Sequence, residues 1–307
     1  MDSNFKTPRA ILNHYKNGFT GAVCDEEDVK KLLGELPMPI FGAAAYDLYG
    51  SGEGKLSLPF KSLLDFDSGF GPAERQTTGD CVSHSTRNAI DITRSVEIKN
   101  GEREDFVTRG ATEGIYQSRG HRGQGMTCSG AARYVHQSGG ILLRKDYGKV
   151  DLSKYNSTLG ANHRIPDSIY KTEAKKHQVK TISNVRTVEE ARDALANGYA
   201  MSVCSGYGFS SRRDGNGIAK RSGSWSHAMA WIACDDSRKT LNETLFLVQN
   251  SWGTWNSGPK THDQPDGSFW IREKDARGML SGGGAWVFSD VEGFPARKVE
   301  WTIDEVF

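Results

Sequence analysis

The stretch Val248–Gly253 (VQNSWG) is the most informative part of this 307-residue chain. It closes a short apolar run, so we expect Asn250 at the end of a β-strand and Trp252 in the turn that follows. An Asn side-chain oxygen placed there can accept a hydrogen bond from an imidazole and fix its tautomer. A neighbouring Trp ring can shield that bond from water. The stretch therefore predicts that a histidine elsewhere in the chain contacts Asn250 and that a nucleophile lies beside this histidine.

A cysteine and a histidine elsewhere in the chain have suitable local settings. Cys81 follows Gly79-Asp80 and begins a predicted helix, so its sulfur should face unpaired backbone N–H groups and the positive end of the helix dipole. Both effects predict a lowered thiol pKa. His227 lies in Ser224–Met229 (SWSHAM), at the start of a predicted strand. His84 shares a helical face with Cys81, but it is poorly placed to reach over a substrate, which favours His227.

The order Cys81, His227, Asn250 resembles that of the papain-like (cathepsin-type) cysteine peptidases. The Cys-to-His separation of 146 residues agrees with the family spacing of about 130–150, and the Cys-to-Asn separation of 169 indicates a longer hairpin between His and Asn. Further similar segments are Gly130–Gly140 (GAARYVHQSGG), Val188–Phe209 and Gly267–Arg272 (GSFWIR). The resemblance extends from about residue 58 to about residue 288. It suggests a divergent, bacterial or phage-type member.

This resemblance implies an α+β, two-lobed papain-like fold, with an active cleft between a helical N-terminal lobe and a β-rich C-terminal lobe. It implies a thiol peptidase that hydrolyses peptide bonds through a Cys81-His227-Asn250 triad and an acyl-enzyme, without cofactor or metal. Residues 57–307 would form the peptidase domain. Residues 1–56 would be an N-terminal extension, either propeptide-like or an anchoring arm, joined through a flexible Gly50–Gly54 (GSGEG).

The resemblance also implies roles for residues outside the triad. The family has an oxyanion-hole Gln six residues before the nucleophile; here Gln76 lies five residues before Cys81, and a one-residue deletion would bring it into place. Cys204 and Ala228 would line a pocket for the substrate's second side chain, and Trp252 would also contact substrate. The nucleophile segment Thr78–Val82 (TGDCV) differs from the family's Cys-Gly-Ser-Cys-Trp.

Composition limits the other classes of function. The formal net charge is +1, with 39 Lys+Arg against 38 Asp+Glu, which favours neither nucleic acid nor an anionic membrane as a partner. No apolar stretch approaches the roughly 18 residues of a membrane helix. Residues 1–20 lack the apolar core of a secretion signal, so we expect a cytoplasmic or virion-associated protein.

The five cysteines also suggest a reducing environment. They are an odd number, widely spaced and without a CxxC pair, so we expect neither disulfides nor a zinc site and place Cys128, Cys204 and Cys234 in the core as reduced thiols. The Gly-rich basic stretch with Arg109, Arg119, His121 and Arg122 is predicted to be a solvated loop rather than a nucleic-acid patch. Asp263 and Asp266 favour a turn over a calcium site, because their spacing does not match an EF-hand loop.

Hydrophobic periodicity and capping signals predict helices before strands. The predicted helices are Asp25–Leu36, Cys81–Ile98, Ser129–Gln137 and Thr187–Asn197. The predicted strands are Ala200–Ser205, Ser226–Cys234, Thr244–Asn250, Ser268–Arg272 and Ala285–Asp290. Helices first and strands last are typical of an α+β domain.

Two alternatives remain open. One is a catalytically weak or inactive papain-like module with a structural or interaction role, such as a phage virion component, with a protein partner for the extension. The other is a different acyl transfer on the same triad, such as transpeptidation or deamidation. The partner expected from the leading hypothesis is a peptide or protein substrate.

Overall fold

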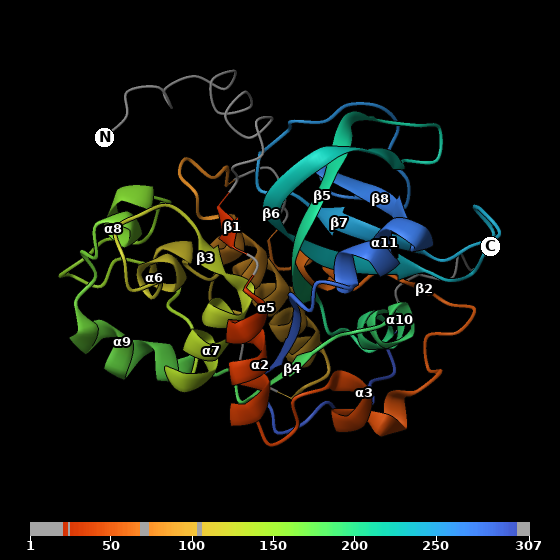
Figure 1. The fold of residues 1–307 in the computed structure, drawn as a ribbon. Coiled ribbons are helices and arrows are strands. Elements are labelled where there is room, and N and C mark those ends of the chain that lie inside the picture. Colours follow the sequence, from red (N-terminus) through yellow and green to blue (C-terminus); the bar gives the residue numbers. More distant parts are fainter. Residues whose placement is uncertain (1–20, 24, 68–73, 103–105, 300–307) are drawn as a thin grey trace.

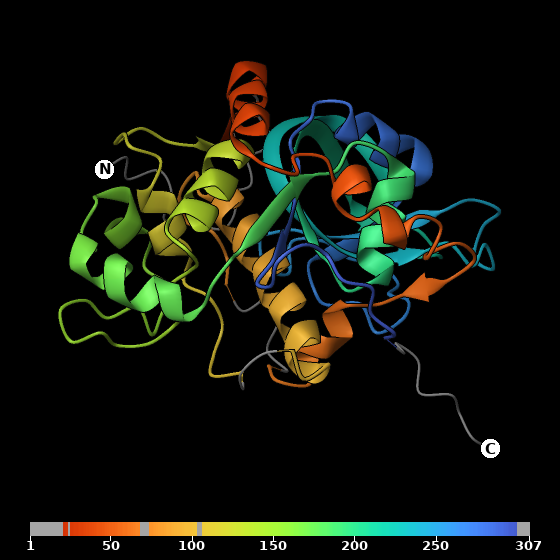
Figure 2. The ribbon, with the colours of Figure 1, turned by 90° about the horizontal axis from the view of Figure 1, so that it is seen from below.

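The long helix α5 (Cys81–Lys99) lies at the centre of the computed structural model, which describes residues 21–23, 25–67, 74–102 and 106–299. Every residue of α5 from Cys81 to Glu97 is buried. The helix packs against α4 (Phe60–Leu64), α6 (Thr112–Gln117) and α7 (Cys128–Gln137) and also against strands of the sheet. Helix α5 is thus enclosed on all sides and lies between two lobes. One lobe is helical and the other is built on a β-sheet, as Figures 1 and 2 show.

The helical lobe contains α6, α7, α8 (Ser157–Ala161) and α9 (Asp167–Glu173). It has a small apolar cluster of its own, which includes Leu142, Leu152 and Ile165. Helix α2 (Glu26–Glu35) lies against α7, and Asp25 caps it by accepting hydrogen bonds from the Glu27 and Asp28 N–H groups, both at 3.0 Å. The short element η3 (Ala174–Lys176) follows α9, whereas α3 (Phe41–Ala44) and η2 (Tyr46–Leu48) contribute Phe41 and Leu48 to the apolar core of the sheet lobe.

The sheet lobe is built on a sheet with strand order β4-β9-β5-β6-β7-β8, all neighbours antiparallel, and β2 also pairs with β6. The strands are β2 (Leu56–Ser57), β4 (Thr181–Asn184), β5 (Met201–Arg213), β6 (Ala219–Asp235), β7 (Leu245–Gln249), β8 (Ser268–Arg272) and β9 (Ala285–Ser289). Helices α10 (Val188–Ala196) and α11 (Glu273–Leu280) cover it (Figure 1). Ile218 also bridges to Trp270 on β8, so the sheet curls toward closure.

The β5–β6 hairpin is longer than the sequence predicted. Cys204 faces Ala228 and Ser205 faces His227, and the register shifts several times beyond Ser205. The hairpin turn at Arg213–Gly217 is stabilised by Asp214, which accepts the N–H groups of Asn216 and Ile218, and Gly217 adopts the φ of +77° that the turn requires. Because the register is irregular, polar and apolar residues do not alternate regularly along this part of the two strands. For this reason, only the regular half of each strand was predicted.

The helix-then-strand prediction agrees with the structure. The helices α2, α5, α7 and α10 lie within one or two residues of the predicted ranges, and β8 has the predicted bounds. Gly50–Gly54 is not the flexible joint that we expected, because the Gly50 and Gly52 N–H groups donate to Asp193 at 2.8 and 3.0 Å and Gly54 donates to Asp236 at 2.8 Å. These carboxylates fix the glycine turn to the sheet lobe.

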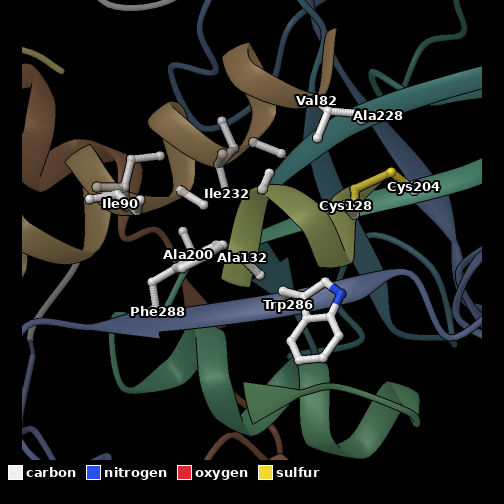
Figure 3. Close-up of a cluster of buried hydrophobic side chains, with 14 of the residues drawn as sticks. Val82, Ile90, Cys128, Ala132, Ala200, Cys204, Ala228, Ile232, Trp286 and Phe288 are labelled. Carbon is white, nitrogen blue, oxygen red and sulfur yellow. A yellow bond between two sulfur atoms is a disulfide. The ribbon is translucent and has the colours of Figure 1, made fainter. Parts of the chain in front are cut away.

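The prediction of reduced thiols was wrong for two cysteines. Cys128, the first residue of α7, forms a disulfide with Cys204 of β5 (Figure 3). The bond joins the helical lobe to the sheet lobe, and Figure 3 shows it among Ala228, Ala132 and Trp286. Cys81 and Cys234 are free and buried.

Candidate active site

Cys81 is the first residue of α5 and is fully buried. The Ala228 N–H faces its thiol closely enough to lower the thiol pKa, so the sulfur lies next to the residue that follows His227. Burial raises the thiol pKa above its usual value, and the adjacent Asp80 raises it further; the Ala228, Val82 and Cys81 N–H groups oppose this shift. The predicted lowering of the pKa is therefore wrong for this closed arrangement, because desolvation outweighs the helix N-terminus.

His227 and Asn250 form the pair predicted from sequence. The His227 Nε2 lies 2.8 Å from Asn250 Oδ1, which also accepts the Ser251 N–H at 2.7 Å. Because an amide oxygen only accepts, Nε2 carries the proton and Nδ1 of the neutral ring is a base. Nδ1 is buried and has no hydrogen-bond partner among the described residues. Burial lowers the pKa of His227 to about 4, and the Asn250 bond partly opposes this.

Aromatic rings cover the His227–Asn250 pair. The Trp252 ring lies 4.7 Å from the His227 ring at 30°, and Trp225 lies 4.8 Å from Trp252. Trp252 is buried and forms part of the sheet-lobe core. The ring therefore shields the imidazole, and its predicted contact with substrate stays a prediction.

Gln76 lies beside the same turn. Its side-chain Oε1 accepts hydrogen bonds from Ser251 Oγ at 2.5 Å and Trp252 Nε1 at 3.1 Å, and its backbone N–H donates to the Ser251 carbonyl at 2.9 Å. Nε2 donates to the Thr78 carbonyl at 2.9 Å, which uses one of its two N–H groups. Gln76 is thus held between the nucleophile loop and the Asn250 turn.

Two residues that could not be found from the sequence hold the nucleophile loop. Gln124 Oε1 accepts the Gly79 N–H at 2.5 Å and the Thr78 hydroxyl at 2.8 Å. Tyr155 donates its hydroxyl to Asp80 Oδ2 at 2.7 Å. Both are far from Cys81 in sequence, and no local motif marks them.

A network of charged side chains, most of them buried, holds the start of the nucleophile loop. Glu74, two residues before Gln76, accepts hydrogen bonds from Arg144 at 2.6 and 2.9 Å and pairs with Arg87 at 3.1 Å. Arg144 also pairs with Glu113 at 2.5 Å. Burial alone would raise the pKa of Glu74, but the two arginines outweigh it and the pKa is lowered.

One residue of the predicted solvated basic loop belongs to this charged interior. Arg109 is buried and donates to Asn88 at 2.7 Å, with Asp91 3.5 Å away. Its expected exposure was therefore wrong. The prediction failed because residues 88 and 91 lie on α5, well before Arg109 in sequence.

Strand β1 (Ala22–Val23) crosses between the lobes near Cys81. It pairs in parallel with β3 (Met126–Thr127) and lies alongside β5 and β6 (Figure 1). The Met126 N–H donates to the Gly21 carbonyl at 2.9 Å, and a Cβ on Gly21 would lie only 2.2 Å from the Gly79 carbonyl oxygen. Ala22 is buried, whereas Val23 is exposed. The segment thus packs tightly on the nucleophile loop.

The two predicted pocket residues lie opposite each other. Cys204 and Ala228 are register partners on β5 and β6, and both are buried. Cys204 is bonded to Cys128, which directly follows β3. The structure therefore puts a cystine where a free thiol was expected, and the substrate contact itself stays a prediction.

Among the described residues, no group of three or more His, Cys, Asp or Glu side chains is placed to hold a metal ion. Within the same part of the chain, no helix is long and apolar enough to cross a membrane. Asp266 pairs with Lys260, and Asp263 with Lys61 at 3.2 Å, so each carboxylate of that turn has a cation beside it.

Comparison with solved structures gives the class of fold. The chain is similar to xylellain, a cysteine protease from Xylella fastidiosa, with a TM-score of 0.54 and 16% identity over 90% of this chain and 98% of that one. It is also similar to procathepsin B S9 from Trypanosoma congolense, with a TM-score of 0.56 and 13% identity over 94% of this chain and 89% of that one. No family model and no curated protein matches the sequence. The chain has the α+β papain-like fold expected from its sequence.

Proposed function

We propose that this protein is a thiol peptidase in which Cys81 is the nucleophile and His227, oriented by Asn250, is the general base and acid. The observation that carries the proposal is the 2.8 Å bond between His227 Nε2 and Asn250. It leaves on the ring a buried Nδ1 that has no hydrogen-bond partner in the described part of the chain, next to Ala228, whose N–H faces the Cys81 thiol. The papain-like fold supports a polypeptide substrate.

The reaction would proceed by two acyl transfers. The Cys81 proton passes to His227 Nδ1, and the sulfur attacks the peptide carbonyl to form a tetrahedral adduct. His227 then protonates the leaving amine, and the adduct collapses to a thioester. Water, deprotonated by His227, attacks the thioester, which releases the acid and restores the Cys81 thiol.

Two donors support stabilisation of the developing oxyanion. The Cys81 N–H belongs to the first turn of α5, and Gln76 Nε2 retains one N–H that no hydrogen bond among the described residues uses. Two positioned donors are the usual composition of an oxyanion hole. The hydrogen bonds of Gln76 to Ser251 and Trp252 would orient its side chain for this role.

Chemical labelling and peptide hydrolysis test the proposal. In a chain released by the substitution Gly21→Ala described below, we expect an epoxide or iodoacetamide probe to modify Cys81 in preference to Cys234. In the same background, hydrolysis of a fluorogenic peptide should disappear in Cys81→Ala and persist in Cys234→Ala. Retention of hydrolysis in Cys81→Ala, or equal labelling of both thiols, would contradict the proposed nucleophile.

We further propose that the extension, residues 1–56, restrains the site. The contacts of Gly21 with Gly79 and of β1 with β3 support this, because they lie over the loop that carries Cys81. The full burial of Cys81 and His227 agrees with a latent enzyme.

A glycine substitution tests the restraint. Gly21→Ala would place a methyl group against the Gly79 backbone at a residue with φ +105°, so the segment must shift and peptide hydrolysis should increase. Gly34→Ala on α2, which meets no atom within 4 Å, is the matched control. Absence of both hydrolysis and Cys81 labelling in Gly21→Ala would favour the alternative of an inactive structural module.

A further inference from the structure

A groove of about 730 Å³ lies on the sheet lobe, between the turn end of the β5–β6 hairpin and the junction of β8 with α11. Figure 1 shows these elements side by side. Its cationic lining residues are Arg212, Arg213, Lys220, Arg221, Arg272 and Lys274. Only two carboxylates, Asp214 and Asp275, share the lining. In a chain with a net charge of +1, this basic groove is a strong local excess of positive charge.

Most of these cations lack an acidic partner. Arg272 pairs with Glu243 at 2.7 Å. Four other cations of the lining are exposed, namely Arg212, Lys220, Arg221 and Lys274. Among the described residues, no carboxylate lies within 4.0 Å of any of these four side chains. Asp214 is already engaged, since its Oδ1 accepts N–H groups from Asn216 and Ile218. The groove thus carries six cations against two carboxylates, a local excess of positive charge.

Two arginines are fixed before any ligand arrives. Arg213 is buried at the base and donates to the Gly258, Pro259 and Ser268 carbonyls at 2.8–2.9 Å. Arg221 lies over the Tyr207 ring, 3.9 Å from its centre. Cations that are already ordered lose less conformational entropy when an anion binds.

The groove is connected to the candidate active site through β6. Arg221 and His227 are on this strand, and their separation of six residues corresponds to about 20 Å of extended chain. A polypeptide bound in the groove could therefore reach the site with a linker of about six residues. No aromatic side chain is among the described residues that line the groove, whereas single-stranded nucleic acid is usually bound on aromatic platforms.

We propose that the basic groove binds an acidic, extended segment of the polypeptide substrate, outside the catalytic site. This proposal rests on the proposed peptidase function. Such a surface would select substrates by a feature remote from the scissile bond and would speed their association at low salt.

Binding to the full-length Cys81→Ala chain tests the groove without turnover. The probe is a fluorescent peptide with six consecutive Glu residues, measured by anisotropy against a peptide with Gln at the same positions. We expect the Glu peptide to bind at least 10-fold more tightly at 50 mM salt, and the triple variant Arg212→Gln, Lys220→Gln, Lys274→Gln to abolish the difference. The matched control is Lys31→Gln, Lys149→Gln, Lys154→Gln, which removes three exposed charges outside the groove.

Three results would overturn the proposal: equal binding of the Glu and Gln peptides, an equal loss in the control variant, or tighter binding of a six-nucleotide single-stranded DNA than of the Glu peptide.

A kinetic experiment links the groove to catalysis. A Glu tail six residues from the cleaved bond should raise kcat/KM about 10-fold in Gly21→Ala, and the groove substitutions should remove that gain while the untailed peptide is cleaved as before. An unchanged gain in the groove variant contradicts the proposal. If neither peptide is cleaved, the peptidase proposal fails, and the binding measurement still decides whether the groove takes acidic peptides.

Discussion

Behind the nucleophile loop, the helical lobe buries charged groups, with Glu74, Arg87, Glu113 and Arg144 in mutual contact. Behind His227, the sheet lobe buries aromatic rings, such as Trp231 against Phe246 at 5.0 Å. Buried ion pairs gain little net stability but fix geometry when every partner is present, whereas apolar packing stabilises directly. The two halves of the candidate site should therefore lose stability in different ways when they are mutated.

The tryptophans allow the lobes to be followed separately. All seven lie at or beyond residue 225, and the six that fall among the described residues lie in the sheet lobe. Tryptophan fluorescence therefore follows the sheet lobe, while far-UV circular dichroism also follows the helices.

The largest effect is expected from breaking the charge network. Arg144→Met removes one of the two arginine partners of Glu74 and the arginine partner of Glu113, whose carboxylate stays buried, which should lower the free energy of unfolding by about 3–5 kcal/mol. Urea unfolding followed by circular dichroism measures it. Phe246→Leu in the sheet lobe is the control, with an expected loss below about 1.5 kcal/mol. Similar losses in both variants would show that the two interiors do not differ in this respect.

The next largest effect concerns the bond between the lobes. Cys128→Ala with Cys204→Ala removes a cross-link over a sequence separation of 76 residues. Chain-entropy arguments give a loss of about 4 kcal/mol, and measured losses are commonly about 2–4 kcal/mol. Thiol counting by mass spectrometry on the unfolded, unreduced wild-type chain should find three reactive thiols, from Cys24, Cys81 and Cys234. Five would contradict the bond.

The same difference between lobes explains what the sequence could predict. The contact of His227 with Asn250 and Trp252 could be predicted because each residue lies in a short motif. Helix α10 could be predicted because Thr187 caps the Glu190 N–H, while the Glu190 carboxylate accepts the N–H of Arg186, one residue before the cap. The fold followed from the order of these segments.

The missed features depend on contacts between distant segments. Gln124 and Tyr155 contact the nucleophile loop from positions far along the chain, and the arginines that hold Glu74 are also distant from it in sequence. The spacing of Cys128 and Cys204 does not indicate that they form a disulfide. The thiol pKa was predicted in the wrong direction, because the helix N-terminus can be inferred from sequence but burial cannot. Local chemistry is visible in one sequence, and desolvation is not.

Acid should weaken the charge network. The folded-state pKa of Glu74 lies below its usual value of 4.5, so its contribution is fully present above that pH and is lost as the pH falls toward the folded-state pKa. A tenfold difference in acid dissociation constant between the folded and unfolded chains corresponds to about 1.4 kcal/mol of stability. Unfolding free energies measured between pH 7 and pH 3 should decline below about 4.5, and Glu74→Gln should reduce the decline.

One buried carboxylate opposes this trend. Burial and the neighbouring Asp290 raise the pKa of Glu97, so its protonation favours the folded state at low pH. If the free energy of unfolding of the wild-type chain falls with pH no more steeply than that of Glu74→Gln, then Glu74 does not control the response of stability to acid.

The smallest effect separates local helix signals from lobe packing. Thr187 Oγ1 accepts the Glu190 N–H at 3.1 Å at the start of α10, so Thr187→Ala should cost about 1 kcal/mol. Because α10 packs on the sheet lobe, tryptophan fluorescence and circular dichroism should report the same loss in urea. Thr187→Ser, which keeps the cap, is the matched control and should be nearly neutral. If Thr187→Ala lowers the free energy of unfolding by about 3 kcal/mol or more, the effect exceeds the usual range for a helix cap. The cap would then be one of the features that hold the lobes together. The contrast between local and long-range stabilisation would then fail at α10, a helix that local signals predicted to within one residue at each end.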